Sequence, residues 1–126
     1  MSPRDSELQR WAGDETPEFV VLLDTAASAS EALLIGPEAI RASGDQLRAV
    51  ATAGQDRLGS HPCPDPDLGD RLARLIERYG FMARSFEAPT DEYGDGYLPA
   101  LGHQLRTLIA DLTVFVSDLG HAIEGH

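Results

Sequence analysis

The stretch 98-LPALGHQLRTLIADLTVFVSDLGHA-122 carries the most regular apolar pattern of the chain. Its apolar residues alternate spacings of three and four: Leu98, Leu101, Leu105, Leu108, Leu112, Phe115, Leu119 and Ala122. This seven-residue repeat places one continuous apolar stripe along an α-helix. Ile109, Val116 and Ile123 add a second apolar edge. We therefore expect a long C-terminal helix that is wide enough to contact two neighbours.

Three earlier segments show helical periodicity as well. The first, residues 16–36, is predicted to begin with a Thr N-cap and a Pro at the first helical position. The second, residues 37–58, also begins with Pro. The third, residues 65–88, begins with Asp-Pro-Asp, whose carboxylates suit the positive end of the helix dipole. Its arginines lie mostly off the apolar stripe and are expected to face solvent: Arg71, Arg74, Arg78 and Arg84.

Four apolar-striped helices joined by short connections predict an all-α fold, an antiparallel bundle of about four helices. The connection at Gly36-Pro37 is nearly absent. The alternative is therefore a three-helix bundle whose long N-terminal helix is kinked at that point. The 126 residues fit a single helical domain. Residues 1–15 are expected to form an N-terminal arm that is either poorly ordered or packed back on the bundle.

The composition argues against several classes of partner. The net charge of −11 repels phosphate backbones, so we expect no nucleic acid. No apolar run approaches the roughly 20 residues of a membrane span, so no membrane insertion is expected. The polar N-terminus does not look like a cleavable signal peptide. A cytoplasmic location is predicted, with export lacking a cleavable signal as the alternative.

The residues that could carry chemistry do not form a recognised catalytic pattern. Cys63 sits in the proline-rich loop 61-HPCPDPD-67 and is interpreted as an incidental loop thiol. Near the C-terminus, Asp118 and His121 are spaced like metal ligands, but both flank the apolar stripe without replacing a core position. We therefore predict no metal, no cofactor and no enzyme activity. A bundle that binds a metal ion or a small ligand in its interior is the alternative function.

A non-catalytic protein-interaction role is the leading prediction, with a second copy of the chain or another protein as partner. An apolar helix face and the acidic, aromatic loop before residue 98 would supply the contacts. The candidate contact residues are Trp11, Tyr93, Tyr97, Leu101, Leu108 and Phe115. Two interpretations stay open, because Trp11, Leu101, Leu108 and Phe115 could equally be core residues.

Two motifs resemble a known family. The stretch 37-PEAIRASGDQL-47 and the turn 91-DEYGDGY-97, which leads into the last helix, resemble small actinobacterial helical proteins. These are the WXG-type proteins and the related excreted virulence factor proteins linked to type VII secretion. The chain departs from the family in its extra segment 68–86, in the N-terminal place of Trp11-Ala12-Gly13, and in lacking the Tyr-x-x-x-Asp/Glu export signal. The resemblance therefore implies an accessory or chaperone-like relative.

Overall fold

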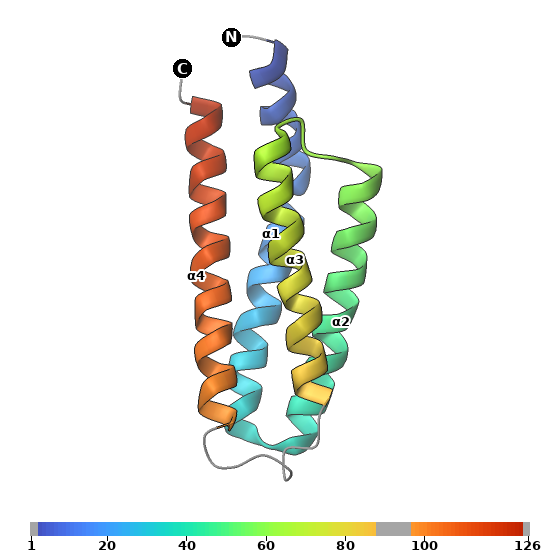
Figure 1. Cartoon of the computed structure of the whole chain (residues 1–126), viewed down its shortest axis with the longest axis vertical. Coiled ribbons are helices and arrows are strands. Elements are labelled where there is room, and N and C mark those ends of the chain that lie inside the picture. Colours follow the sequence, from blue (N-terminus) through green and yellow to red (C-terminus); the bar gives the residue numbers. More distant parts are fainter. Residues whose placement is uncertain (1–2, 88–96, 125–126) are drawn as a thin grey trace.

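The computed structural model describes residues 3–87 and 97–124, the side chains of residues 3–5 excepted, and contains no strand in those ranges. It forms four helices: α1 (Pro3–Ile35), α2 (Pro37–Ser60), α3 (Pro66–Glu87) and α4 (Tyr97–Glu124). They run alternately up and down, so α1 begins and α4 ends at the same end of the bundle (Figure 1). Each helix packs against two neighbours, in the order α1, α2, α3, α4 and back to α1. The predicted antiparallel four-helix bundle is confirmed.

One glycine reverses the chain between α1 and α2. Gly36 has φ 148° and ψ −178°, a backbone conformation that only glycine adopts at low cost. Its carbonyl accepts the first hydrogen bond of α2 from the amide of Ile40 at 3.0 Å. The two helices therefore pack side by side as a hairpin, and the kinked-rod alternative is wrong.

Helix α1 begins at Pro3, so the predicted start at Thr16-Pro17 is wrong. The buried stripe of α1 continues upstream through Trp11 and Leu8, which are 2% and 5% exposed. Pro17 lies inside the helix, where it lacks the amide hydrogen that would bond back along the ladder. Residues 3–15 of the predicted arm are therefore the first turns of α1, and burial of Leu8 and Trp11 outweighs the missing hydrogen bond.

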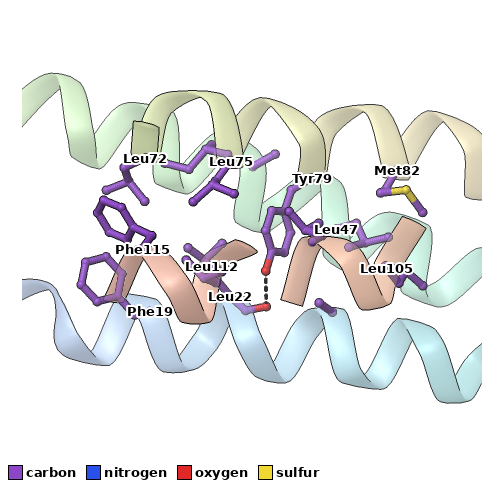
Figure 2. Packing of buried hydrophobic residues seen from close by; sticks show 14 of the residues in the cluster. Phe19, Leu22, Leu47, Leu72, Leu75, Tyr79, Met82, Leu105, Leu112 and Phe115 are labelled. Atoms are coloured by element: carbon purple, nitrogen blue, oxygen red, sulfur yellow. Dashed lines mark hydrogen bonds between the residues drawn. The ribbon is translucent and has the colours of Figure 1, made fainter. Parts of the chain in front are cut away.

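The predicted heptad stripe of α4 faces the core. Leu101, Leu105, Leu108, Leu112, Phe115 and Leu119 are at most 3% exposed. Phe115 meets Phe19 edge to face with ring centroids 5.7 Å apart, and Figure 2 shows Phe115 between Phe19 and Leu72. Tyr79 is fully buried, and its hydroxyl donates a hydrogen bond of 2.7 Å to the carbonyl of Leu22. These contacts join α1, α3 and α4 into one core.

The two sides of α3 are packed differently. Towards α2, a Cβ added at Gly44 would lie 3.1 Å from Phe86 Cβ, and one at Gly54 would lie 3.2 Å from Ile76 Cδ1. Small residues on α2 therefore let these two helices approach closely. The backbones of α3 and α4 approach each other closely at fewer positions than those of the other three neighbouring pairs. Helix α3 begins as predicted, because Asp65 Oδ1 accepts hydrogen bonds from the amides of Asp67 and Leu68 at 3.0 and 3.2 Å.

Candidate functional site

The structure places four of the predicted contact residues in the interior. Leu101, Leu108 and Phe115 are 2%, 1% and 0% exposed, and Trp11 is 2% exposed. The sequence left partner contact and internal core as alternatives, and the structure gives the core. The reason is that the α4 stripe closes on α1 and α3, which leaves none of these side chains on the surface of this chain.

The two tyrosines of the predicted loop differ in what the structure shows. Tyr97 is half-buried at the start of α4, and its hydroxyl donates a hydrogen bond of 2.7 Å to the carbonyl of Ser85. It therefore ties the first turn of α4 to the last turns of α3. Tyr93 lies outside the described residues.

The two metal-ligand candidates of α4 are not brought together with further ligands. Asp118 Oδ2 lies 2.8 Å from Nη2 of Arg71, so this carboxylate is already paired with a cation. His121 is exposed one turn further along the helix. Among residues 3–87 and 97–124, no three His, Cys, Asp or Glu side chains are grouped so that they could hold a metal ion.

A charge pair with a buried carboxylate joins the first turns of α1 to the end of α2. Glu15 is only 4% exposed, and its two carboxylate oxygens accept hydrogen bonds from Nε of Arg57 at 2.9 and 3.1 Å. The hydrogen bond and the charge of Glu15 raise the pKa of Arg57 above its ordinary value. Arg57 therefore supplies the charged hydrogen-bond partner that a buried carboxylate requires.

His61 and Trp11 complete this α1–α2 polar cluster, which we define as Trp11, Asp14, Glu15, Arg57 and His61. The indole Nε1 of Trp11 donates a hydrogen bond of 2.9 Å to the carbonyl of His61. The His61 ring nitrogen Nε2 lies 3.5 Å from Asp14 Oδ2 and 3.8 Å from Glu15 Oε1. That nitrogen is buried and has no hydrogen-bond partner within residues 3–87 and 97–124. The cluster thus fastens the N-terminal part of α1 to the loop after α2.

The hollow beside this cluster is too small for an ordinary ligand. It measures about 60 Å³ and is lined mainly by apolar side chains of α1, α2 and α3, with Glu15, Glu18 and Arg57 among its polar members. Ligand pockets usually enclose about 300–1,000 Å³. The interior charges were missed from the sequence, although Glu15 falls at helical spacing between Trp11 and Phe19 on the buried stripe.

Cys63 is half-buried in the loop between α2 and α3. Burial raises the pKa of the Cys63 thiol, which disfavours the reactive thiolate. The imidazole of His61 is held close to Asp14 and Glu15 by the geometry described above. The loop therefore offers a weak nucleophile, in agreement with an incidental thiol.

The largest hollows described on the surface follow one another between α3 and α4. One, of about 220 Å³, is lined by Arg71, Arg74, Leu75, Arg78, Asp111 and Val114. The next, of about 310 Å³, is lined by Arg78, Phe81, Met82, His103, Gln104, Thr107 and Leu108. Because Arg78 lines both, the two hollows are neighbours, and we call them together the α3–α4 groove.

Two ion pairs cross the groove and one arginine is left over. Arg71 pairs with Asp118 at 2.8 Å, and Arg78 pairs with Asp111 at 2.6 Å. Arg71 also lies over the ring of the buried Phe115, with 5.6 Å between its Cζ and the ring centroid. Arg74, between the two paired arginines, has no ion-pair or hydrogen-bond partner among the described side chains. The expectation that the arginines of α3 face solvent therefore holds for the exposed Arg74 and Arg84, whereas Arg71 and Arg78 are half-buried in ion pairs with α4.

Exposed apolar side chains accompany these charges. Phe81 is 60% exposed, and the Arg84 guanidinium lies 5.3 Å from its ring centroid. Val114 is 54% exposed on the α4 side of the same groove. Leu34 and Ile35 are exposed as well, at the turn between α1 and α2, but neither lines the hollows described above. The groove is thus a concave surface with exposed apolar side chains and one arginine, Arg74, that has no ion-pair partner among the described side chains.

Comparisons with protein-family models, with curated proteins and with solved structures give no match for this chain. No described helix has both the length and the apolar character that crossing a membrane requires.

Proposed function

We propose that the protein is a non-catalytic helical bundle that binds a protein partner through the α3–α4 groove. The observation that carries this proposal is the joint placement of Phe81 and Val114, both more than half exposed, on the hollows lined by Arg71, Arg74 and Arg78. Exposed apolar side chains gathered at one concave surface mark interaction sites, and aromatic residues and arginine dominate binding energies there.

The groove is also built on rigid elements. Its walls are α3 and α4, whose inner faces carry the core residues Leu75, Met82 and Leu108. A partner would therefore meet side chains whose backbone positions are already fixed, which lowers the entropy lost on binding. The contacts predicted from the sequence along the α4 stripe are replaced in this proposal by side chains on the neighbouring edge of α4.

The predicted relationship to WXG-type proteins is a separate proposal, supported only by the stretches 37–47 and 91–97. It would make the chain an accessory or chaperone-like component beside a type VII secretion system. The groove proposal does not depend on it, because the groove lies on α3 and α4 and the first of these motifs lies on α2.

Site-specific photo-cross-linking tests the proposed function. A benzophenone amino acid would replace Thr107, which lines the groove, and in a control chain Thr52, which is exposed on α2. Each variant would be expressed in the cells from which the sequence comes. We expect one discrete adduct from position 107, none from position 52, and loss of the adduct when Phe81→Asp is added.

The Phe81→Asp change should leave the fold intact, because the side chain is 60% exposed. Circular dichroism with thermal unfolding checks this before cross-linking. Equal adducts from positions 107 and 52, or an adduct from 107 that persists in the Phe81→Asp chain, would contradict the proposed function.

A further inference from the structure

The geometry points to an acidic helix as the partner segment, carrying apolar side chains between its carboxylates and lying lengthwise in the α3–α4 groove. This inference rests on the proposed function and adds the chemistry of the partner. It is argued from the distribution of charge, from the spacing of the arginines and from the exposure of the ion pairs that already cross the groove.

The groove is a positive region on a strongly negative protein. Its three arginines face Asp111 and Asp118, which gives a net charge of +1. The rest of the chain has seven bases against 19 acids, a net charge of −12. An acidic segment is therefore repelled by most of the surface and attracted at the groove, which selects both the partner and the docking place.

The arginine spacing matches a helix. Arg71, Arg74 and Arg78 follow at intervals of three and four residues, so they lie along one edge of α3. Arg71 and Arg78 are one heptad apart, about 10.5 Å along the axis. A helix lying beside α3 repeats with the same period, so carboxylates seven residues apart can face both arginines while a third faces Arg74.

The ion pairs that already cross the groove can exchange their carboxylates for those of a bound helix. The side chains of Arg71 and Asp118 are 40% and 45% exposed, and those of Arg78 and Asp111 are 37% and 50% exposed. Exposed pairs of this kind contribute little to stability, so a partner carboxylate can replace or share them at small cost. Arg74 needs no exchange at all, because it is unpaired among the described residues. Phe81 and Val114 then meet the apolar side chains of the bound helix.

A second copy of this chain fits the groove less well. In a twofold dimer the same patch meets itself, so the Arg74 side chains and the net positive grooves would face each other. Docking the groove on the acidic surface of a second copy would instead be head to tail, which builds a ring or an open filament and not a closed twofold dimer. We therefore assign the groove to an acidic segment of a separate protein.

The test uses the full chain and a designed probe. The probe is a fluorescein-labelled amphipathic helical peptide of about 21 residues, three heptads, with leucines along one seam and glutamates on both flanks. Its matched control has every glutamate replaced by glutamine. Fluorescence anisotropy gives the Kd of each peptide at low salt and at 1 M salt, where the Debye length falls to about 3 Å.

We expect the acidic probe to bind at least about tenfold more tightly than the glutamine probe at low salt, and the difference to vanish at 1 M salt. Arg74→Glu should weaken the acidic probe by about tenfold. Arg41→Glu is the matched control, because Arg41 is exposed on α2 and the change in net charge is the same. It should change the Kd less than about twofold, since charges beyond a Debye length are screened.

Equal binding of the glutamate and glutamine probes, or equal weakening by Arg74→Glu and Arg41→Glu, would overturn the acidic-helix inference. A concentration-dependent dimer in light scattering that Arg74→Glu abolishes would overturn it too, since the occupant would then be a second copy. In each case the cross-link from position 107 would still decide the proposed function on its own.

Discussion

The α1–α2 polar cluster and the α3–α4 groove both contain arginine–carboxylate pairs between neighbouring helices, and the carboxylates of the two regions differ in exposure. In the α1–α2 polar cluster, the Glu15 side chain is 5% exposed beneath Arg57. In the α3–α4 groove, the carboxylates of Asp118 and Asp111 are 45% and 50% exposed. The arginines of the two regions are alike, because Arg57, Arg71 and Arg78 are 42%, 40% and 37% exposed. A buried carboxylate that loses its partner is left in an apolar environment, whereas an exposed one returns to water. We therefore expect the α1–α2 polar cluster to contribute to stability and the α3–α4 groove to contribute to partner binding.

Trp11→Ala should break the α1–α2 cluster most severely. Trp11 is 2% exposed, contacts Phe19 edge to face and donates to the His61 carbonyl. Truncating a buried aromatic side chain costs about 3–5 kcal/mol. Urea unfolding followed by circular dichroism measures the loss, since the only tryptophan is removed. Trp11→Phe is the control for the hydrogen bond and should cost about 1 kcal/mol. A wild-type unfolding midpoint for Trp11→Ala would show that these turns of α1 contribute nothing.

At the Glu15–Arg57 pair, the stability lost by removing one charge should be regained when the second charge is removed too. This is not expected of the groove pairs. Arg57→Leu leaves the Glu15 carboxylate buried without its donor, so Tm should fall by about 5 °C or more. The double change Glu15→Leu with Arg57→Leu removes both charges and should restore Tm to the wild-type value or above it. A double variant as unstable as the single one would show that the pair itself stabilises the bundle.

The buried Tyr79 of α3 should make the stability of the bundle depend on pH under alkaline conditions, whereas its neighbour Arg78 lies in the groove. Arg78 faces the groove, while burial raises the pKa of the Tyr79 phenol well above its ordinary value. The unfolded chain then releases the Tyr79 proton first, so stability is full below about pH 10 and decreases above it. The slope should approach about 1.4 kcal/mol per pH unit. Urea midpoints from pH 9 to 11 measure it, and Tyr79→Phe should remove this part of the decrease. An unchanged slope in Tyr79→Phe contradicts the assignment.

The smallest effect on stability is expected in the groove. Arg78→Ala breaks the exposed pair with Asp111 and should change the free energy of unfolding by about 0–1 kcal/mol. The same variant should bind the acidic probe more weakly than the wild type. Thermal unfolding and anisotropy on one preparation give both values. A loss of several kcal/mol would place this pair with the structural cluster instead.

The fold was largely predictable because the heptad of α4 is uninterrupted from Leu98 to Ala122. The start of α1 was missed because Glu15 occupies a position of the buried stripe, and a charge there breaks the apolar periodicity. Its partner Arg57 lies on another helix, so only the three-dimensional packing explains why the charge is tolerated. Because Glu15 falls at the spacing of the core residues, it is the sequence signal from which α1 could have been extended towards the N-terminus.

The groove could be predicted only in part. The arginines of α3 lie off the apolar stripe in the sequence, which correctly separates them from the core. Their pairing with Asp111 and Asp118 depends on how far apart α3 and α4 lie, and helical periodicity carries no information on that distance. The exposure of Phe81 likewise depends on its angle around α3 relative to α4.

NMR of the full chain with the acidic probe tests most directly which region binds. The indole N–H of Trp11 is a unique reporter of the α1–α2 cluster, since the chain has one tryptophan, and the methyl groups of Val114 report on the groove. We predict that the Val114 methyl resonances shift on titration while the Trp11 indole resonance stays in place. A shifted indole with unchanged Val114 methyls would contradict the assignment of recognition to the α3–α4 groove.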